Sequence, residues 1–166
     1  CNITLVMKAE SIKKIREALD CLDRNTLNHL CLSLAKFKIE NKELISYLLF
    51  EAENEDEYIN KTKRYVNQMF NEINTTNYFY VKKSVRRILK KVRKYCRYSN
   101  HNETEVELLL YFCHQMCDIN PSIFKNKTLS NIFIRLLNSI KNKTIKLHED
   151  LQYEYNIEIQ KLNNKI

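Results

Sequence analysis

Apolar residues recur every three or four positions along most of this chain, a spacing that predicts amphipathic helices. The stretch from Ser11 to Leu22 carries one apolar stripe behind a serine cap, so we expect an ordinary surface helix there. From Asp23 to about Lys38 the apolar residues cover nearly the whole circumference. This second pattern predicts a helix that is buried more deeply than the first.

Two more helices are expected before the middle of the chain. Asn41 can start a helix that runs to Phe50, and Asn54 is suited to cap the next one, which extends to about Asn74. The acidic residues between 51 and 57 favour the positive end of that helix. Its apolar stripe, roughly 140° wide, consists of Tyr58, Tyr65, Val66, Met69, Phe70 and Ile73.

The C-terminal part of the chain predicts a central helix and a long final one. Residues 106–117 are apolar in every direction, so we expect them at the centre of the fold, capped by Asn102. Pro121 marks the clearest break, and a helix follows from about Thr128 to Ile140. The last helix either lies along the bundle or projects as a coiled-coil partner, since a nearly seven-residue rhythm connects Ile145, Leu151, Tyr155, Ile159 and Leu162.

The absence of glycine and the single proline support the same fold class, because strands and tight turns normally need glycine at positive φ. We predict an all-α single domain over residues 1–166, with seven or eight helices in antiparallel hairpins, arranged as a helical bundle or a short α-solenoid. A Walker phosphate loop, a G-x-G-x-x-G dinucleotide turn and a G-x-S-x-G nucleophile elbow are excluded, since each requires glycine.

The net charge of +8 and the pI near 9.1 favour anionic partners. No apolar run has the length of a membrane span or of a signal peptide, so we expect a cytoplasmic protein without a membrane partner. One reading makes Met7 the natural start and residues 1–6 sequence upstream of it. Another makes residues 1–7 a disordered or non-native leader. We expect the cysteines to be buried, reduced thiols: Cys1, Cys21, Cys31, Cys96, Cys113 and Cys117.

One predicted helix, residues 78–98, concentrates positive charge. On a helical wheel its basic residues fall within roughly 180° and its apolar residues on the other half. The nine cations are Lys82, Lys83, Arg86, Arg87, Lys90, Lys91, Arg93, Lys94 and Arg97, and no acidic residue occurs between Glu72 and Glu103. We interpret this face as a surface that contacts phosphates of a polyanion such as nucleic acid, with aromatic residues at the helix ends for stacking.

Two other interpretations of the basic face remain open. It can be an ordinary solvated surface, or it can meet the acidic residues 51–57 across a helix pair or from another subunit. No helix-turn-helix or RNA-binding signature accompanies it, so recognition by shape and charge is favoured over recognition of a sequence. A competing function is a protein-interaction scaffold or homodimer that uses helix grooves or the long C-terminal helix.

The sequence offers little for metal or catalytic chemistry. Cys113 and Cys117 lie one helical turn apart, with Cys96 and His101 near them in sequence, but structural zinc usually takes cysteine pairs on turns. At His148, the H-E-x-x-H pattern fails because glutamine stands where the second histidine should be. We expect no metal, no cofactor, no catalytic residue and no enzyme activity.

Two segments, residues 104–113 (TEVELLLYFC) and 147–155 (LHEDLQYEY), resemble stretches of a bacterial family of all-helical proteins with no assigned function. The resemblance covers about the last two thirds of the chain. It implies an all-α fold and assigns no site residue, because these are helix-forming strings and not chemical motifs.

Overall fold

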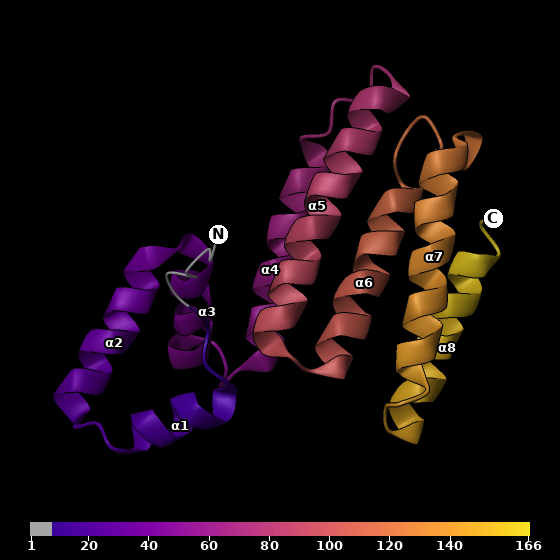
Figure 1. Ribbon diagram of the computed structural model, residues 1–166. Helices are drawn as coiled ribbons and strands as arrows, with labels where there is room; N and C mark the ends of the chain where they lie inside the picture. Colours follow the sequence, from indigo (N-terminus) through magenta and orange to yellow (C-terminus); the bar gives the residue numbers. More distant parts are fainter. Residues whose placement is uncertain (1–7) are drawn as a thin grey trace, which may run out of the picture. The chain divides into compact units, whose positions relative to one another are not determined.

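The computed structural model describes residues 8–166, and all regular structure in that range is helical (Figure 1). This confirms the all-α prediction with eight α-helices. They are α1 (Ile12–Asp20), α2 (Arg24–Phe37), α3 (Ile39–Phe50), α4 (Glu55–Asn71), α5 (Tyr78–Ser99), α6 (Asn102–Cys117), α7 (Lys127–Thr144) and α8 (Glu149–Asn163), with a 3-10 turn, η1 (Ile123–Lys125), before α7.

The chain divides into two compact units, residues 1–46 and residues 47–166, and each is described by itself. We call them the N-terminal unit and the C-terminal unit. The prediction of one domain over the whole chain stays a prediction. The expectations for Cys1 and for a leader that ends at Met7 lie outside the described residues.

Polar caps begin most of the helices where the sequence predicts them. The Asn54 side chain accepts a hydrogen bond from the Glu57 amide at 3.1 Å, and the Asn77 side chain accepts from the amides of Phe79 and Tyr80. Asn100, with φ of 58°, ends α5 in the left-handed region that glycine usually fills. Asn102 is an exception, because it is the first residue of α6 and not its cap.

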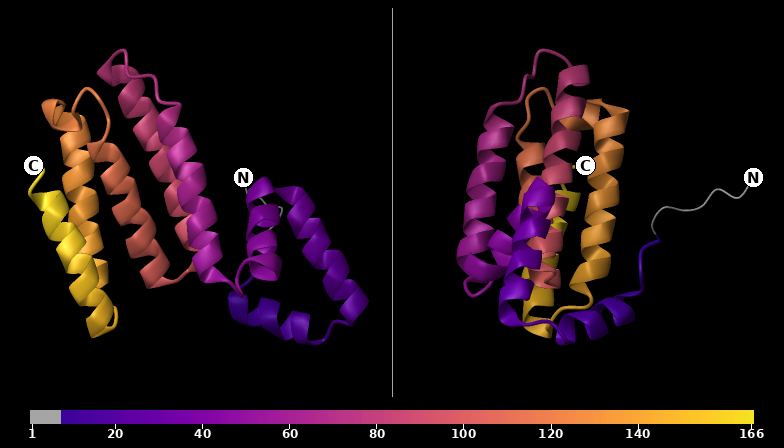
Figure 2. Two further views of the ribbon diagram at one scale, coloured as in Figure 1. Left: turned by 180° about the vertical axis from the view of Figure 1, so that it is seen from behind. Right: turned by 60° about the vertical axis from the view of Figure 1, so that its left-hand side comes forward.

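Helix α6 is the centre of the C-terminal unit, as its apolar circumference predicts. It packs against α4, α5, α7 and α8, and Figures 1 and 2 show it between α5 and α7. Its fully buried side chains point in several directions and include Val106, Phe112, Cys113 and Met116. Since one helix supplies the interior surface for four others, its apolar residues on every side find partners.

The last helix, α8, lies along the bundle and does not project from it. Ile159 and Leu162 are buried against the core, and α8 packs on both α6 and α7. A contact of 3.1 Å between His114 Nε2 and Glu158 Oε2 joins α8 to α6 at the surface. The structure therefore matches the first of the two arrangements that the seven-residue rhythm allows. Ile145, which the rhythm also included, is not part of this helix, because it is the exposed C-cap residue of α7.

A polar cluster around Glu55 joins residues of four helices, α3, α4, α5 and α6. The Glu55 carboxylate, at the start of α4, accepts hydrogen bonds from the hydroxyls of Ser99 at the end of α5, Thr104 in α6 (2.5 Å) and Tyr47 in α3 (2.8 Å). The imidazole of His101 lies 3.6 Å from the same carboxylate. Burial alone would raise the pKa of Glu55, but these bonds outweigh it and hold the pKa below its ordinary value of 4.5.

The prediction of deep burial for α2 was wrong. No residue of α2 is buried, and none is buried anywhere from Lys8 to Ser46. A single residue, Lys38 in an extended conformation, separates α2 from α3, whereas two helices that pack side by side need a loop of about two to five residues. Helix α2 therefore lacks, within its own unit, the neighbours that its apolar circumference would require.

We expect replacement of Phe112 by alanine to lower the free energy of unfolding by about 3–5 kcal/mol, because it removes a fully buried ring from the centre of the C-terminal unit. The lost contacts include the edge-to-face pair with Phe70, whose ring centroid lies 5.3 Å away. Urea denaturation followed by circular dichroism measures the change.

Phe79→Ala is the matched control, since the Phe79 ring is 67% exposed and its removal is expected to change the same free energy by less than about 0.5 kcal/mol. Equal effects of the two substitutions would contradict the assigned core.

The Glu55 cluster predicts a pH-dependent contribution to stability. Because the folded-state pKa of Glu55 is lowered, its contribution is present above the ordinary value of 4.5 and is lost as the pH falls through the folded value. Glu55→Gln is expected to be less stable than the native protein by about 1–3 kcal/mol at neutral pH. The difference should shrink at roughly pH 3, and chemical denaturation at both pH values measures it.

Glu53→Gln is the control, because Glu53 is exposed and its side chain has no hydrogen-bond partner in the described part of the chain. We expect Glu53→Gln to change the free energy of unfolding by less than about 0.5 kcal/mol at either pH. A gap for Glu55→Gln that stays constant between the two pH values would show that the charge of Glu55 is not what the hydroxyls stabilise.

Candidate functional site

Helix α5 presents its charge because its other half is held in the core. Val81, Val85, Ile88 and Val92 are fully buried, and the helix packs against α4 and α6. The amphipathic division predicted for residues 78–98 is therefore the one that the structure shows. A cation on the opposite half has to extend into solvent or over the edge of a neighbouring helix.

The nine predicted site residues do not share one environment. Six are exposed, namely Lys83, Arg86, Arg87, Lys90, Arg93 and Arg97, while Lys82 and Lys91 are half-buried. Lys94 is the exception to the predicted solvent-facing surface, since it is only 9% exposed. Its ammonium group lies 5.4 Å from the ring centroid of the adjacent Tyr95 and 5.8 Å from that of Tyr98, one turn further along, so two aromatic rings lie close to it.

Four of the exposed cations line one groove between α5 and α7. The groove has a volume of about 770 Å³, and Arg86, Lys90, Arg93 and Arg97 form its α5 wall. Arg135 contributes a fifth cation from α7. The apolar side chains that line the same groove are Leu89, Leu109, Ile132 and Leu136, which come from α5, α6 and α7. We call this feature the basic groove.

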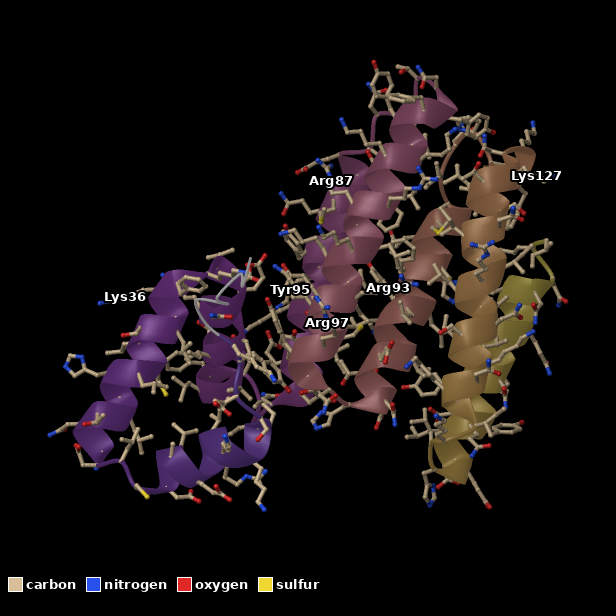
Figure 3. All side chains as sticks on the ribbon, viewed as in Figure 1. Lys36, Arg87, Arg93, Tyr95, Arg97 and Lys127 are labelled. Atoms are coloured by element: carbon tan, nitrogen blue, oxygen red, sulfur yellow. The ribbon has the colours of Figure 1, made fainter. Side chains whose placement is uncertain are left out.

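Helical spacing explains why these four cations of α5 act together. Arg86, Lys90, Arg93 and Arg97 are separated by three or four residues, so they form a row on one side of the helix that is about 16 Å long. Figure 3 shows Arg93 and Arg97 on the side of α5 toward α6 and α7, and Arg87 at its other edge. The basic half predicted from sequence thus consists of two rows, and the basic groove takes one of them.

The cations of the basic groove have no ion-pair partner in the part of the chain that the structure describes. Within residues 8–166, none of the five forms an ion pair or a side-chain hydrogen bond. Glu105, the one acidic residue of the lining, is bound to Lys143 at 2.8 Å. Of the acidic residues proposed to neutralise α5, Glu51 pairs with Lys61 at 2.8 Å and Glu57 with Arg64 at 2.9 Å.

The cysteines considered for metal binding lie outside the basic groove. Burial raises the pKa of Cys96 to about 12 and raises that of Cys113 further, so both thiols stay protonated at neutral pH. Among residues 8–166 no group of three His, Cys, Asp or Glu side chains could hold a metal ion. The expectation of buried thiols was wrong for Cys21 and Cys31, which are exposed because no residue of their unit from Lys8 to Ser46 is buried, and Cys117 is only half-buried.

Sequence reasoning missed Arg135 as a site residue. It lies 38 positions after Arg97, on a helix that carries no concentration of charge, and only the packing of α5 and α7 on α6 brings it to the basic groove. The periodicity of α7 predicts an exposed position for Arg135 beside the apolar stripe. It does not predict which helix lies across the groove.

Comparison with protein-family models, with curated proteins and with solved structures finds no match to this chain. The resemblance of residues 104–113 and 147–155 to a bacterial helical family stays a prediction. No helix among residues 8–166 has both the length and the apolar character needed to cross a bilayer. The geometry of the basic groove is therefore the main basis for a functional hypothesis.

We expect Arg93→Gln to stabilise the fold. Arg93 lies one turn from both Lys90 and Arg97, and like charges at this spacing destabilise a helix by about 0.2–0.5 kcal/mol per pair. Removing one charge should therefore raise the free energy of unfolding by roughly 0.5 kcal/mol at low salt, and the gain should shrink in 1 M NaCl. Thermal denaturation at both salt concentrations measures this.

Arg64→Gln is the control and should act in the opposite direction or not at all, because Arg64 has an attractive partner in Glu57. If Arg93→Gln destabilised the protein at low salt, the row of cations would have a partner that offsets its repulsion.

Proposed function

We propose that the basic groove binds the phosphate backbone of a nucleic acid and that the protein is a binding module without catalytic activity. The observation that carries this proposal is a set of five cations, on two helices, around one concave surface, none of which has an ion-pair partner among residues 8–166. Unpaired cations at this density repel one another, and a phosphate backbone is a ligand that would neutralise several of them at once.

The dimensions of the basic groove favour a single strand over a duplex. Helices α5 and α7 both pack on α6, and neighbouring helix axes are usually about 8–10 Å apart, so the space above α6 is about one helix wide. One extended strand fits this width. A row of cations about 16 Å long matches roughly five nucleotides at the rise of about 3.4 Å per nucleotide of a stacked strand, and fewer when the strand is extended.

Recognition in this proposal does not depend on base sequence. The lining supplies guanidinium and ammonium groups for phosphate oxygens and aliphatic side chains for the groove floor. Contacts to phosphate position a strand without reading its bases. The aromatic residues at the ends of α5 that the sequence suggested for stacking, among them Tyr78 and Tyr98, do not line the basic groove.

Binding to a fluorescent single-stranded oligonucleotide of mixed sequence tests the proposal. If all five cations contact phosphates, the logarithm of the association constant should fall with the logarithm of salt concentration with a slope of about −3.5. Arg135→Gln should weaken binding several-fold at low salt and reduce the magnitude of the slope by about 0.7. Fluorescence anisotropy between low and moderate salt gives both quantities.

Arg87→Gln is the matched control, since Arg87 is an exposed arginine of α5 that does not line the basic groove. It removes the same charge and should leave the slope nearly unchanged. Equal losses for Arg87→Gln and Arg135→Gln would indicate diffuse attraction to a basic protein, and an absence of salt-sensitive binding would reject the proposal. Tighter binding of a duplex than of a single strand of equal length would contradict the width argument.

A further inference from the structure

We propose that two copies of this chain associate through their N-terminal units, with α1 of each copy seated in the groove between α2 and α3 of the other. The N-terminal unit has no buried residue between Lys8 and Ser46, although its three helices are rich in apolar side chains. A polypeptide segment of this size without a core of its own usually requires a partner surface to be stable.

The receiving surface is a groove of about 530 Å³ at the junction of α2 and α3, which we call the α2–α3 groove. Leu32, Ala35 and Ile39 give it an apolar lining, and Lys36, Lys38 and Lys42 complete it. It exists because the single-residue connection at Lys38 keeps the two helices from packing along their lengths. The exposed apolar surface of this region includes Phe37, which is 76% exposed.

Helix α1 has the pattern that such a groove accepts. Ile12, Ile15 and Leu19 occupy positions i, i+3 and i+7 on one face, the spacing by which an amphipathic helix anchors in an apolar groove. Ile12 is 73% exposed and Ile15 is 42% exposed, so this stripe has little cover in the N-terminal unit. Asp20, near one edge of the stripe, can approach the lysines of the α2–α3 groove.

The α1 that fills the groove has to come from another copy. Helix α1 has nine residues and is about 14 Å long, and three residues connect it to α2. Folded back along its own α2, it would cover about the first nine residues of that helix, as far as Leu32. The α2–α3 groove continues from Leu32 to Lys42, beyond this reach.

The exposed apolar area and the charge of the N-terminal unit both suit self-association. Its large exposed apolar residues are Ile12, Ile15, Leu30, Leu32, Leu34, Phe37, Ile39 and Leu44. With roughly 200 Å² for each such side chain when fully exposed, they present on the order of 800 Å², about what each partner buries in a standard interface. Residues 8–46 contain eight Lys or Arg and six Asp or Glu, so the two N-terminal units repel each other only weakly.

Sedimentation velocity of the full chain over roughly 1–200 µM tests the proposal. The expected result is a concentration-dependent species of twice the 20.0 kDa mass of one chain. Ile12→Ser, in the docking helix, and Leu32→Ser, in the receiving groove, should each weaken dimerisation at least about tenfold. Circular dichroism shows whether each variant keeps its helical content.

Ile145→Ser is the matched control, since Ile145 is 71% exposed, nearly the same as Ile12, but lies in the C-terminal unit. It should leave dimerisation unchanged. A native protein that stays monomeric throughout the concentration range overturns the proposal, whatever the variants do. A dimer that Ile12→Ser and Leu32→Ser leave intact also overturns it, because the interface then lies elsewhere. Oligonucleotide binding by the basic groove is a separate measurement and can succeed or fail independently.

Discussion

The C-terminal unit depends on the burial of the apolar side chains of α6. Four helices pack on it, and its apolar side chains are enclosed on every side. Because α5 and α7 both take α6 as their support, they lie on either side of it and their outer faces form the walls of one groove. The concave basic surface is thus a consequence of the packing around one apolar helix, and the arginines and lysines only line it.

The apolar half of α5 explains how the fold tolerates the uncompensated charges on the other half. Fully burying a valine or isoleucine side chain contributes about 1.5–3 kcal/mol, and α5 buries Val81, Val85, Ile88 and Val92 completely. Repulsion between like charges one turn apart amounts to only about 0.2–0.5 kcal/mol per pair. Hydrophobic burial therefore exceeds the repulsion several-fold, and the charges can remain available for a ligand.

Much of the fold could be predicted from the sequence because it depends on local signals. Asn54 and Asn77 cap helices through their own next turn, and the apolar circumference of α6 requires a central place. The opposite outcome for α2 shows the limit of this reasoning. The apolar pattern of α2 resembles that of α6. Because only Lys38 connects α2 to α3, however, α2 has few neighbours within its unit.

The candidate site could be predicted only as far as one helix determines it. The wheel of α5 identified the cations, but it did not separate the row in the basic groove from the other row or show that Tyr95 and Tyr98 lie close to Lys94. Arg135 and the Glu55 cluster both involve residues more than 35 positions apart that meet only after packing. Such contacts leave no periodic signal in a single sequence.

The anchoring of α5 at Ser99 has a consequence for how a ligand would be received. Ser99 lies two residues after Arg97, and its bond to Glu55 fixes the end of the helix to the starts of α4 and α6. A helix held in this way cannot slide along its axis, so its cations keep their register opposite α7 before any ligand arrives. The backbone of α5 then has little conformational entropy to lose on association, and the entropic cost of binding falls on the exposed arginine and lysine side chains.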